Sequence, residues 1–146
     1  MQPALLRYDT YALFLFVMES PMQSSPILVI EDNADFAAIL ETVLRLWGYN
    51  IQHYDTLAGG RKALSRLRPA MLILDGQLPD GEGIDLYREL RKMAATCTLP
   101  ILLLSVSDDV YQAARAASDA DPHLHVGLKP MPLDEIQAIV QRLVAV

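Results

Sequence analysis

The chain has 146 residues, of which 52% are hydrophobic and 21% charged, and its formal net charge at pH 7 is -6. This is the length of one ordinary domain, and the composition excludes a disordered or fibrous chain. The acidic balance disfavours direct binding of nucleic acid, because such a surface needs a basic stripe to neutralise phosphates. The one cysteine, Cys97, excludes an intrachain disulfide and indicates a reducing, cytoplasmic setting.

An apolar extension, residues 1–25, precedes the rest of the chain. Its run YALFLFVM, residues 11–18, resembles the core of a signal peptide, but no small-residue cleavage site follows it. A helix between Pro3 and Pro21 would reach only ~25 Å, less than the ~30 Å hydrocarbon core of a membrane. We therefore expect no membrane span.

The apolar residues of this extension fall on every side of a helical projection. In a protein surrounded by water such a segment must be buried, either against its own domain or against a second chain. Both alternatives stay open, and the second would make a homodimer through residues 4–20. If translation starts at Met22 instead, residues 1–21 have no role.

From residue 26 onward, short apolar runs alternate with longer stretches of helical period. Buried strands are expected at residues 27–30, 49–54, 70–75, 100–105 and 123–129, and helices at 34–47, 57–67, 83–93, 110–117 and 133–144. In the first helix a core-facing stripe is predicted at Phe36, Ile39, Leu40, Val43, Leu44 and Trp47. Strict alternation predicts a three-layer α/β fold with a doubly wound, five-stranded parallel sheet.

Polar residues follow four of the five predicted strands. They are Glu31 and Asp32 after the first, Asp75 at the end of the third, Ser105 at the end of the fourth and Lys129 at the end of the fifth. Because ligands bind beyond the carboxyl ends of the strands in open parallel sheets, we expect these side chains to line one rim.

Three carboxylates at one rim would repel one another, by ~4 kcal/mol per pair at 4 Å in an effective dielectric of 20. A positive charge must therefore lie among them. Lys129 supplies one unit, and Mg²⁺, which prefers carboxylate and carbonyl oxygens, would supply two. Such a pocket suits phosphoryl transfer, with Asp75 as the nucleophile.

Each of these residues also has a simpler interpretation. Asp32 or Asn33 could cap the following helix, and Asp75 could begin the turn before LPDG. Ser105 could be a hydroxyl at a strand end and Lys129 a solvated charge. The joint placement at four strand ends favours the site.

The sequence resembles the receiver domain of two-component response regulators. The resemblance covers residues 26–146 and rests on VIEDN, LILDGQLPDGEG, ILLLSVS and LKPMP in the right order and spacing. It implies a flavodoxin-like sheet with strand order 2-1-3-4-5.

The resemblance also assigns roles around a bound Mg²⁺. It implies that Asp75 is the phosphoacceptor, and that Asp32 and the backbone carbonyl of Gln77 are metal ligands. Glu31 would act on the metal through water.

Two further positions of the family pattern contact the phosphoryl group. The resemblance implies that the Ser105 hydroxyl closes on it and that Lys129 pairs with it. It also implies a cis peptide bond between Lys129 and Pro130.

The chain departs from the family pattern at two positions. Receivers usually carry Tyr or Phe three residues before the lysine, where this chain has Val126, which puts the coupling from phosphorylation to the output surface in doubt. The residue after the hydroxyl is usually Ala or Gly, and we expect the bulkier Val106 to narrow access and slow exchange of the phosphoryl group.

The segment from Ser107 to Ala120 is expected to move most on phosphorylation. Ser107 can cap its helix, but the packing residues are mostly small: Ala113, Ala114, Ala116 and Ala117. The face of this fourth helix is an alternative surface for a homodimer.

The predicted function is that of a stand-alone receiver, since the sequence ends at Val146, directly after the last helix. It would take a phosphoryl group from a histidine kinase or a histidine phosphotransfer protein and signal through an unknown output protein. It would not be an enzyme beyond its own phosphoryl transfer and autodephosphorylation.

Three other functions are alternatives to this one. The main alternative is a pseudo-receiver, an interaction module that does not switch by phosphorylation. A haloacid dehalogenase would need a second acid at Gln77, and a nucleotide-binding flavodoxin-like protein would need a glycine-rich loop after the first strand.

Overall fold

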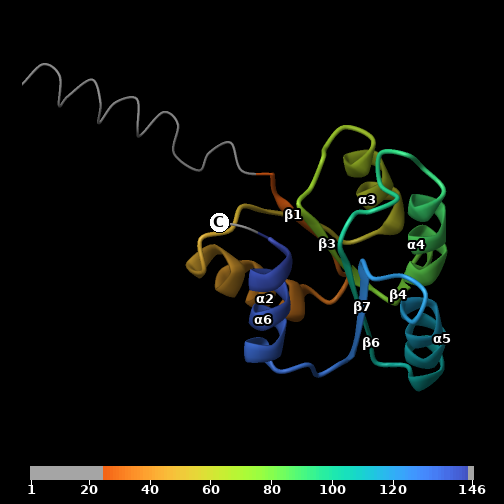
Figure 1. The fold of residues 1–146 in the computed structure, drawn as a ribbon. Helices are drawn as coiled ribbons and strands as arrows, with labels where there is room; N and C mark the ends of the chain where they lie inside the picture. The colour runs from red at the N-terminus through yellow and green to blue at the C-terminus, as the bar shows by residue number, and fades with distance from the viewer. Residues whose placement is uncertain (1–24, 145–146) are drawn as a thin grey trace, which may run out of the picture.

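The computed structural model describes residues 25–144, so the expectations for the extension, including a homodimer through residues 4–20, lie almost entirely outside the described residues (Figure 1). The elements in chain order are β1 (Ile27–Ile30), α2 (Ala34–Leu46), β2 (Ile51–Tyr54), α3 (Leu57–Leu64), β3 (Met71–Asp75), β4 (Gln77–Leu78), β5 (Gly81–Glu82), α4 (Gly83–Arg91), β6 (Ile101–Ser105), α5 (Asp108–Ser118), β7 (Leu124–Leu128) and α6 (Leu133–Leu143). Among these helices, none is both long and apolar enough to cross a membrane.

The main sheet has five parallel strands in the order β2-β1-β3-β6-β7. Its central strands β1, β3 and β6 are buried at every residue, because helices cover both faces of the sheet. The predicted doubly wound fold and the strand order 2-1-3-4-5 are confirmed. The sequence pattern missed the antiparallel pair of β4 and β5, each only two residues long.

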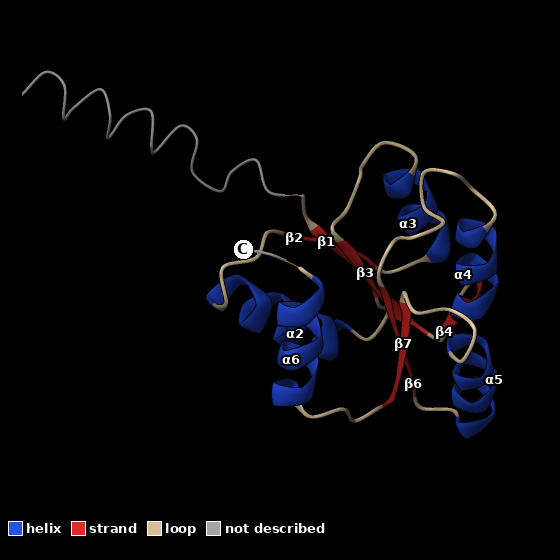
Figure 2. Cartoon of the chain, viewed as in Figure 1, coloured by secondary structure: helices blue, strands red, loops and turns tan. Residues whose placement is uncertain are grey.

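The helices form two layers. Figure 2 shows α2 and α6 on one side of the sheet and α3, α4 and α5 on the other. One core cluster joins Leu40, Leu44, Ile136 and Val140 to the sheet, and the other joins it to residues of α3, α4 and α5. Alternate side chains of each central strand enter opposite clusters, as the pleat requires.

Helix caps account for several element boundaries. The side chains of Asn33, Thr56 and Ser107 accept hydrogen bonds from backbone N–H groups in the first turns of α2, α3 and α5. Element ends differ from the predicted ranges by up to three residues, the largest difference being at α3, which ends at Leu64 rather than at residue 67.

The predicted core stripe of α2 is wrong at one position. Ile39 is 50% exposed, and Ala37, which the pattern left out, is buried. The helical layer beside α2 contains only α6, so a side chain at the outer edge of the stripe stays in contact with solvent.

The alanine-rich helix α5 is packed even more lightly than the sequence predicts. Ala114 is fully buried and Ala117 partly buried, but Ala113 and Ala116 are exposed, which corrects their assignment as packing residues. Partly buried Val110 adds one larger contact.

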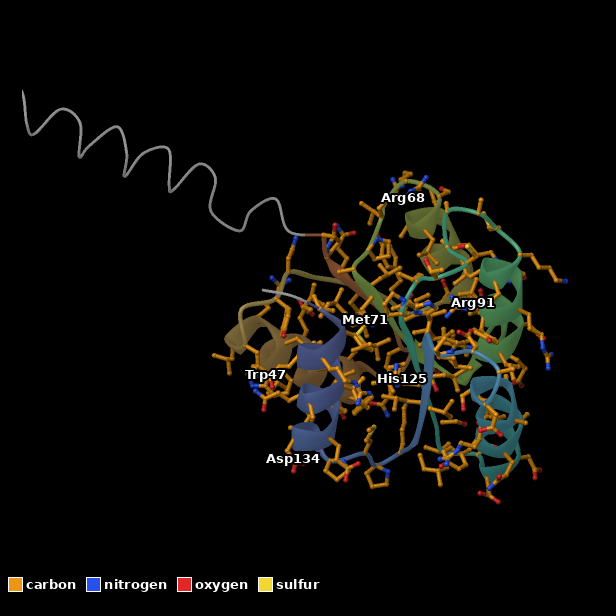
Figure 3. All side chains as sticks on the ribbon, in the orientation of Figure 1. Trp47, Arg68, Met71, Arg91, His125 and Asp134 are labelled. Atoms are coloured by element: carbon orange, nitrogen blue, oxygen red, sulfur yellow. The ribbon has the colours of Figure 1, made fainter. Side chains whose placement is uncertain are left out.

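A polar clamp ties α4 to the loops at the amino ends of β6 and β7 (Figure 3 labels its central Arg91). The Arg91 guanidinium donates to Asp121 at 2.6 Å and to the carbonyl oxygens of Thr96 and Leu99 at 3.0 and 2.8 Å. The Tyr87 hydroxyl donates to the same Asp121 oxygen at 2.7 Å. Each donor therefore has an acceptor, which stabilises this edge of the sheet.

Candidate functional site

The strands deliver the five polar side chains to one edge of the sheet. Glu31 and Asp32 follow β1, Asp75 and Ser105 end β3 and β6, and Lys129 follows β7. These four strands are neighbours in register, so their carboxyl ends lie together.

Three carboxylates meet at this edge. One oxygen each of Glu31, Asp32 and Asp75 lies within 4.8 Å of the other two. Glu31 and Asp75 are buried, with 3% and 7% exposure, whereas Asp32 is exposed. The cluster is therefore open to solvent on the Asp32 side and enclosed elsewhere.

Lys129 contacts two of these carboxylates unequally. Its ammonium lies 2.6 Å from Glu31 Oε2 and 3.4 Å from Asp75 Oδ1. The same ammonium lies 4.7 Å from the centre of the Phe36 ring, a cation–π distance. Sequence reasoning placed Phe36 only in the core stripe of its helix. Phe36 lies four residues after Asp32, in the first turns of a helix that starts at the rim. That position in the sequence could have indicated that its ring lies near the site.

The charge imbalance is visible in the ionisation of Asp75. Burial, a hydrogen bond with Asp32 and the charge of Glu31 together raise the pKa of Asp75 to about 7. Lys129 and the N–H of Gln77 act in the opposite direction without cancelling the rise. One cationic side chain is thus too little for three carboxylates.

Local hydrogen bonds test the simpler interpretations of these carboxylates. Asn33, not Asp32, accepts the capping bond from Phe36 N at 3.0 Å, so Asp32 does not cap α2. Asp75 Oδ1 accepts from Gln77 N at 3.3 Å, so Asp75 does also begin a turn. The structure places Gln77 next to the cluster, and its backbone carbonyl as a metal ligand stays a prediction.

Ser105 sits at the end of β6 against the backbone that follows Asp75. It is fully buried, and its hydroxyl oxygen accepts from Ser107 N at 3.0 Å. A Cβ atom on Gly76 would lie 2.9 Å from Ser105 Cβ, a separation too short for two carbons. Glycine at position 76 therefore allows the loop after Asp75 to approach the Ser105 hydroxyl.

The loop after Asp75 is held from the opposite side by Asp80. The Asp80 carboxylate accepts from Leu57 N and Ala58 N, both at 2.9 Å, at the start of α3. These bonds, with the charge of Arg61, lower the pKa of Asp80. Two carboxylates five residues apart thus have different tasks, one at the rim and one fixing the loop.

The two departures from the family pattern occupy different surroundings. Val106 is 71% exposed directly after Ser105. Val126 lies on β7, half-buried against the core cluster that contains α3, α4 and α5. The Lys129–Pro130 peptide bond is cis, as the resemblance implies.

The family model for the response regulator receiver domain matches residues 27–141. The chain belongs to this family. Receiver domains are phosphoacceptors of two-component systems rather than conventional enzymes.

Individual relatives agree with this assignment. The KDP operon transcriptional regulatory protein KdpE of Escherichia coli (strain K12) is 33% identical over 113 residues, which are 77% of this chain and 48% of that protein. The chain thus spans about half the length of this curated relative.

Solved receiver domains have the same fold. The receiver domain of a signal transduction histidine kinase from Syntrophus aciditrophicus has a TM-score of 0.72 and 27% identity, over 82% of this chain and 89% of that one. The receiver domain of a sensor histidine kinase from Pseudomonas aeruginosa PAO1, solved with a magnesium ion coordinated in the active site cleft, has a TM-score of 0.69 and 26% identity, over 82% and 97%.

The residues of the rim fit a hard divalent cation. Three carboxylates within 4.8 Å offer oxygen ligands, and a cation would oppose the rise that burial, Asp32 and Glu31 cause in the pKa of Asp75. Asp32, exposed at the mouth, leaves room for retained water, which Mg²⁺ favours.

Proposed function

We propose that the protein accepts a phosphoryl group from a phosphohistidine donor onto Asp75 in a Mg²⁺-dependent reaction, and signals by changing its binding to a partner protein. The observation that carries this proposal is the cluster of Glu31, Asp32 and Asp75 with Lys129 at its edge. A carboxylate with a purely structural role, such as Asp121, lies instead against its donors Arg91 and Tyr87.

The transfer exchanges one bond to phosphorus for another. A carboxylate oxygen of Asp75 forms the new bond, and the bond between phosphorus and the donor nitrogen breaks, leaving its electron pair on the imidazole. When bound, Mg²⁺ would offset negative charge on the nucleophile and on the phosphoryl oxygens. Glu31, Asp32, Asp75 and the backbone carbonyl of Gln77 would hold it.

Lys129 and Ser105 would bind the phosphoryl group once it arrives. Lys129 pairs more closely with Glu31 than with Asp75, so its ammonium must turn from Glu31 toward the new phosphoryl oxygens. The Ser105 hydroxyl would give up its bond from Ser107 N as it moves toward the same group.

Helix α5 follows Ser105 directly and would carry the signal. Ala114 is its one fully buried residue, so a shift of this helix breaks little apolar contact. We expect hydrogen exchange in α5 to change more than in α4 when beryllofluoride and Mg²⁺ are added. Equal changes in the two helices would contradict this route.

The alternative is a pseudo-receiver that binds its partner without a phosphorylation switch. Val126 favours it, because a half-buried valine lacks the ring whose rotation couples the hydroxyl to the surface in the family pattern. Beryllofluoride with Mg²⁺ separates the two functions, since a pseudo-receiver gives no change in spectrum or in hydrogen exchange.

The donor and the wider protein belong to the proposal as well. A histidine kinase or a histidine phosphotransfer protein would be the donor, and the output protein would bind near α5. Because the chain matches about half of a transcriptional regulator, a stand-alone arrangement is tested by the mass of the protein isolated from its own cells.

A phosphotransfer assay read by intact mass spectrometry tests the function. The protein should gain one phosphoryl group in the presence of Mg²⁺, and neither the Asp75→Asn variant nor the Mg²⁺-free reaction should gain one. Asp85→Asn, an exposed carboxylate on α4, is the matched control and should be phosphorylated normally. Equal labelling of Asp75→Asn would reject Asp75 as the acceptor.

A further inference from the structure

An apolar groove runs between α2 and α6. It has a volume of ≈ 380 Å³ and is lined by Ala38, Ile39, Thr42, Val43 and Leu133, none of them charged. In Figure 3, Trp47 at the end of α2 and Asp134 near the start of α6 mark the helical layer that carries the groove.

Two exposed large apolar side chains, Ile39 and Leu133, line this groove, and a third, Leu46, lies two turns further along α2. Within residues 25–144 the large hydrophobic residues that remain exposed are Ile39, Leu46, Met93, Val106, Leu128 and Leu133. Three of these six belong to α2 and α6: Ile39 is 50%, Leu46 77% and Leu133 38% exposed. A concentration of this kind indicates a binding surface rather than scattered surface residues.

The sequence also contains a matching apolar segment ahead of the described domain. Residues 11–18, YALFLFVM, contain no charge. The chain enters β1 beside the end of α2, because Ile27 N donates to Asn50 O at 2.8 Å and Tyr49 N to Leu44 O at 3.0 Å. The described chain therefore begins at the end of the sheet where α2 terminates.

The linking residues are long enough for the apolar segment to reach the groove. Residues 19–25 can extend to ~23 Å. The distance along α2 from Leu46 back to Ile39 is only ~10 Å. An extended link therefore leaves ~13 Å for the path from residue 25 to the end of α2.

We propose that residues 11–18 bind the groove between α2 and α6 of their own chain. The groove and the segment are both apolar and uncharged, so the contact buries hydrophobic surface on each side without stranding a charge. The short tether favours this occupant over a second copy, because it holds the segment near the groove at an effective concentration of order mM.

Cysteine crosslinking tests the contact in the full chain. The exposed Cys97 is first replaced by serine, and cysteines are then introduced as Ala12→Cys in the segment and Thr42→Cys at the groove. A short bismaleimide should join the pair within one chain, giving a product of monomer mass. The control pairs Ala12→Cys with Ala116→Cys, an exposed position on α5 across the sheet, and should react far less.

A groove variant separates specific contact from chance collision. Ile39→Asp, added to the Ala12 and Thr42 cysteine pair, should slow the crosslink about fivefold because the groove then presents a charge to apolar side chains. Met93→Asp is the matched control, since Met93 is 53% exposed and lies outside the groove, and it should leave the rate unchanged.

The outcomes decide the proposal independently of phosphorylation. A monomeric product that forms about fivefold more slowly in Ile39→Asp supports it, and a monomeric product that forms at an unchanged rate in Ile39→Asp would overturn it. A product of dimer mass would instead assign the groove to a second copy and overturn the proposal. Crosslinking no faster than to Ala116→Cys would overturn it as well.

Discussion

Two acidic side chains at opposite ends of the sheet show how surroundings shift the pKa of a carboxylate in opposite directions. Asp121, at the amino end of β7, has side-chain exposure of 14%, and Asp75, at the carboxyl end of β3, has 8%. Burial raises the pKa of both. At Asp121 the bonds from Arg91 and Tyr87 outweigh burial, so its pKa ends below the ordinary value.

Asp75 has the opposite balance. Burial and the neighbouring acids Asp32 and Glu31 raise its pKa to about 7. Lys129 lowers the pKa only in part, since its ammonium lies closer to Glu31 than to Asp75. The difference teaches that depth of burial alone does not set the ionisation of a carboxylate. At Asp75 the neighbouring acids add to the effect of burial on the pKa, and a divalent cation would oppose that rise.

The largest expected effect comes from removing the satisfied carboxylate. Asp121→Ala should lower the free energy of unfolding by about 2–4 kcal/mol near pH 7, because it leaves the Arg91 charge and the Tyr87 hydroxyl without their partner. Since the folded state lowers the pKa of Asp121, its contribution is present above 3.8 and is lost as the pH falls below that value. Urea unfolding at pH 7 and pH 3 measures both.

Asp85→Ala is the control for this substitution. Asp85 pairs with Arg88 at 3.5 Å, but the two side chains are 62% and 61% exposed, so the loss should stay below about 1 kcal/mol. Equal losses of unfolding free energy in Asp121→Ala and Asp85→Ala would show that the bonds from Arg91 and Tyr87 add no stability beyond that of an exposed ion pair.

Removing the Asp75 carboxylate should stabilise the protein instead of destabilising it. In the absence of divalent cations, Asp75→Asn should raise the free energy of unfolding at pH 8 by about 1–3 kcal/mol. The folded state binds the Asp75 proton more tightly than the unfolded state does, so stability falls as pH rises from 3.8 to about 7. Thermal unfolding in chelator at pH 8 and pH 3.5 checks this, and destabilisation at pH 8 would contradict it.

Cation binding should depend on the same ionisation. The affinity for Mg²⁺ should fall roughly tenfold from pH 8 to pH 6, because Asp75 goes from mostly ionised to mostly protonated around its pKa of about 7. Calorimetric titration measures it. Asp75→Asn should bind more weakly with a flatter profile, and a flat profile in the unaltered protein would speak against Asp75 as a ligand.

The smallest effect concerns the aromatic neighbour of the site lysine. A double-mutant cycle with Phe36→Leu and Lys129→Met should give a coupling of about 0.5–1 kcal/mol in unfolding, from the ammonium at 4.7 Å from the ring. The same cycle with Val43→Ala in place of Phe36→Leu serves as the control and should give no coupling. A coupling within error of zero for Phe36 would show that the ring only packs.

Much of the fold followed from local pattern, and the misses have physical causes. Apolar runs such as residues 27–30 and 71–74 are read as buried strands because both faces of a central parallel strand are covered. The pair β4 and β5 was missed because two-residue strands have no period to detect. Ile39 was misplaced because helical spacing finds a stripe but not where the neighbouring helix stops covering it.

For the site, the sequence by itself determined which side chains end the strands, since Glu31, Asp32, Asp75, Ser105 and Lys129 can be read in order from the motifs. Only the tertiary structure decided how their charges are shared: that Lys129 lies closer to Glu31 than to Asp75, that Phe36 lies against its ammonium, and that Asp121 is clamped by Arg91. The physical reason is that electrostatic interaction and desolvation depend on distances of a few ångströms between segments far apart in the chain, and such distances leave no mark on local periodicity.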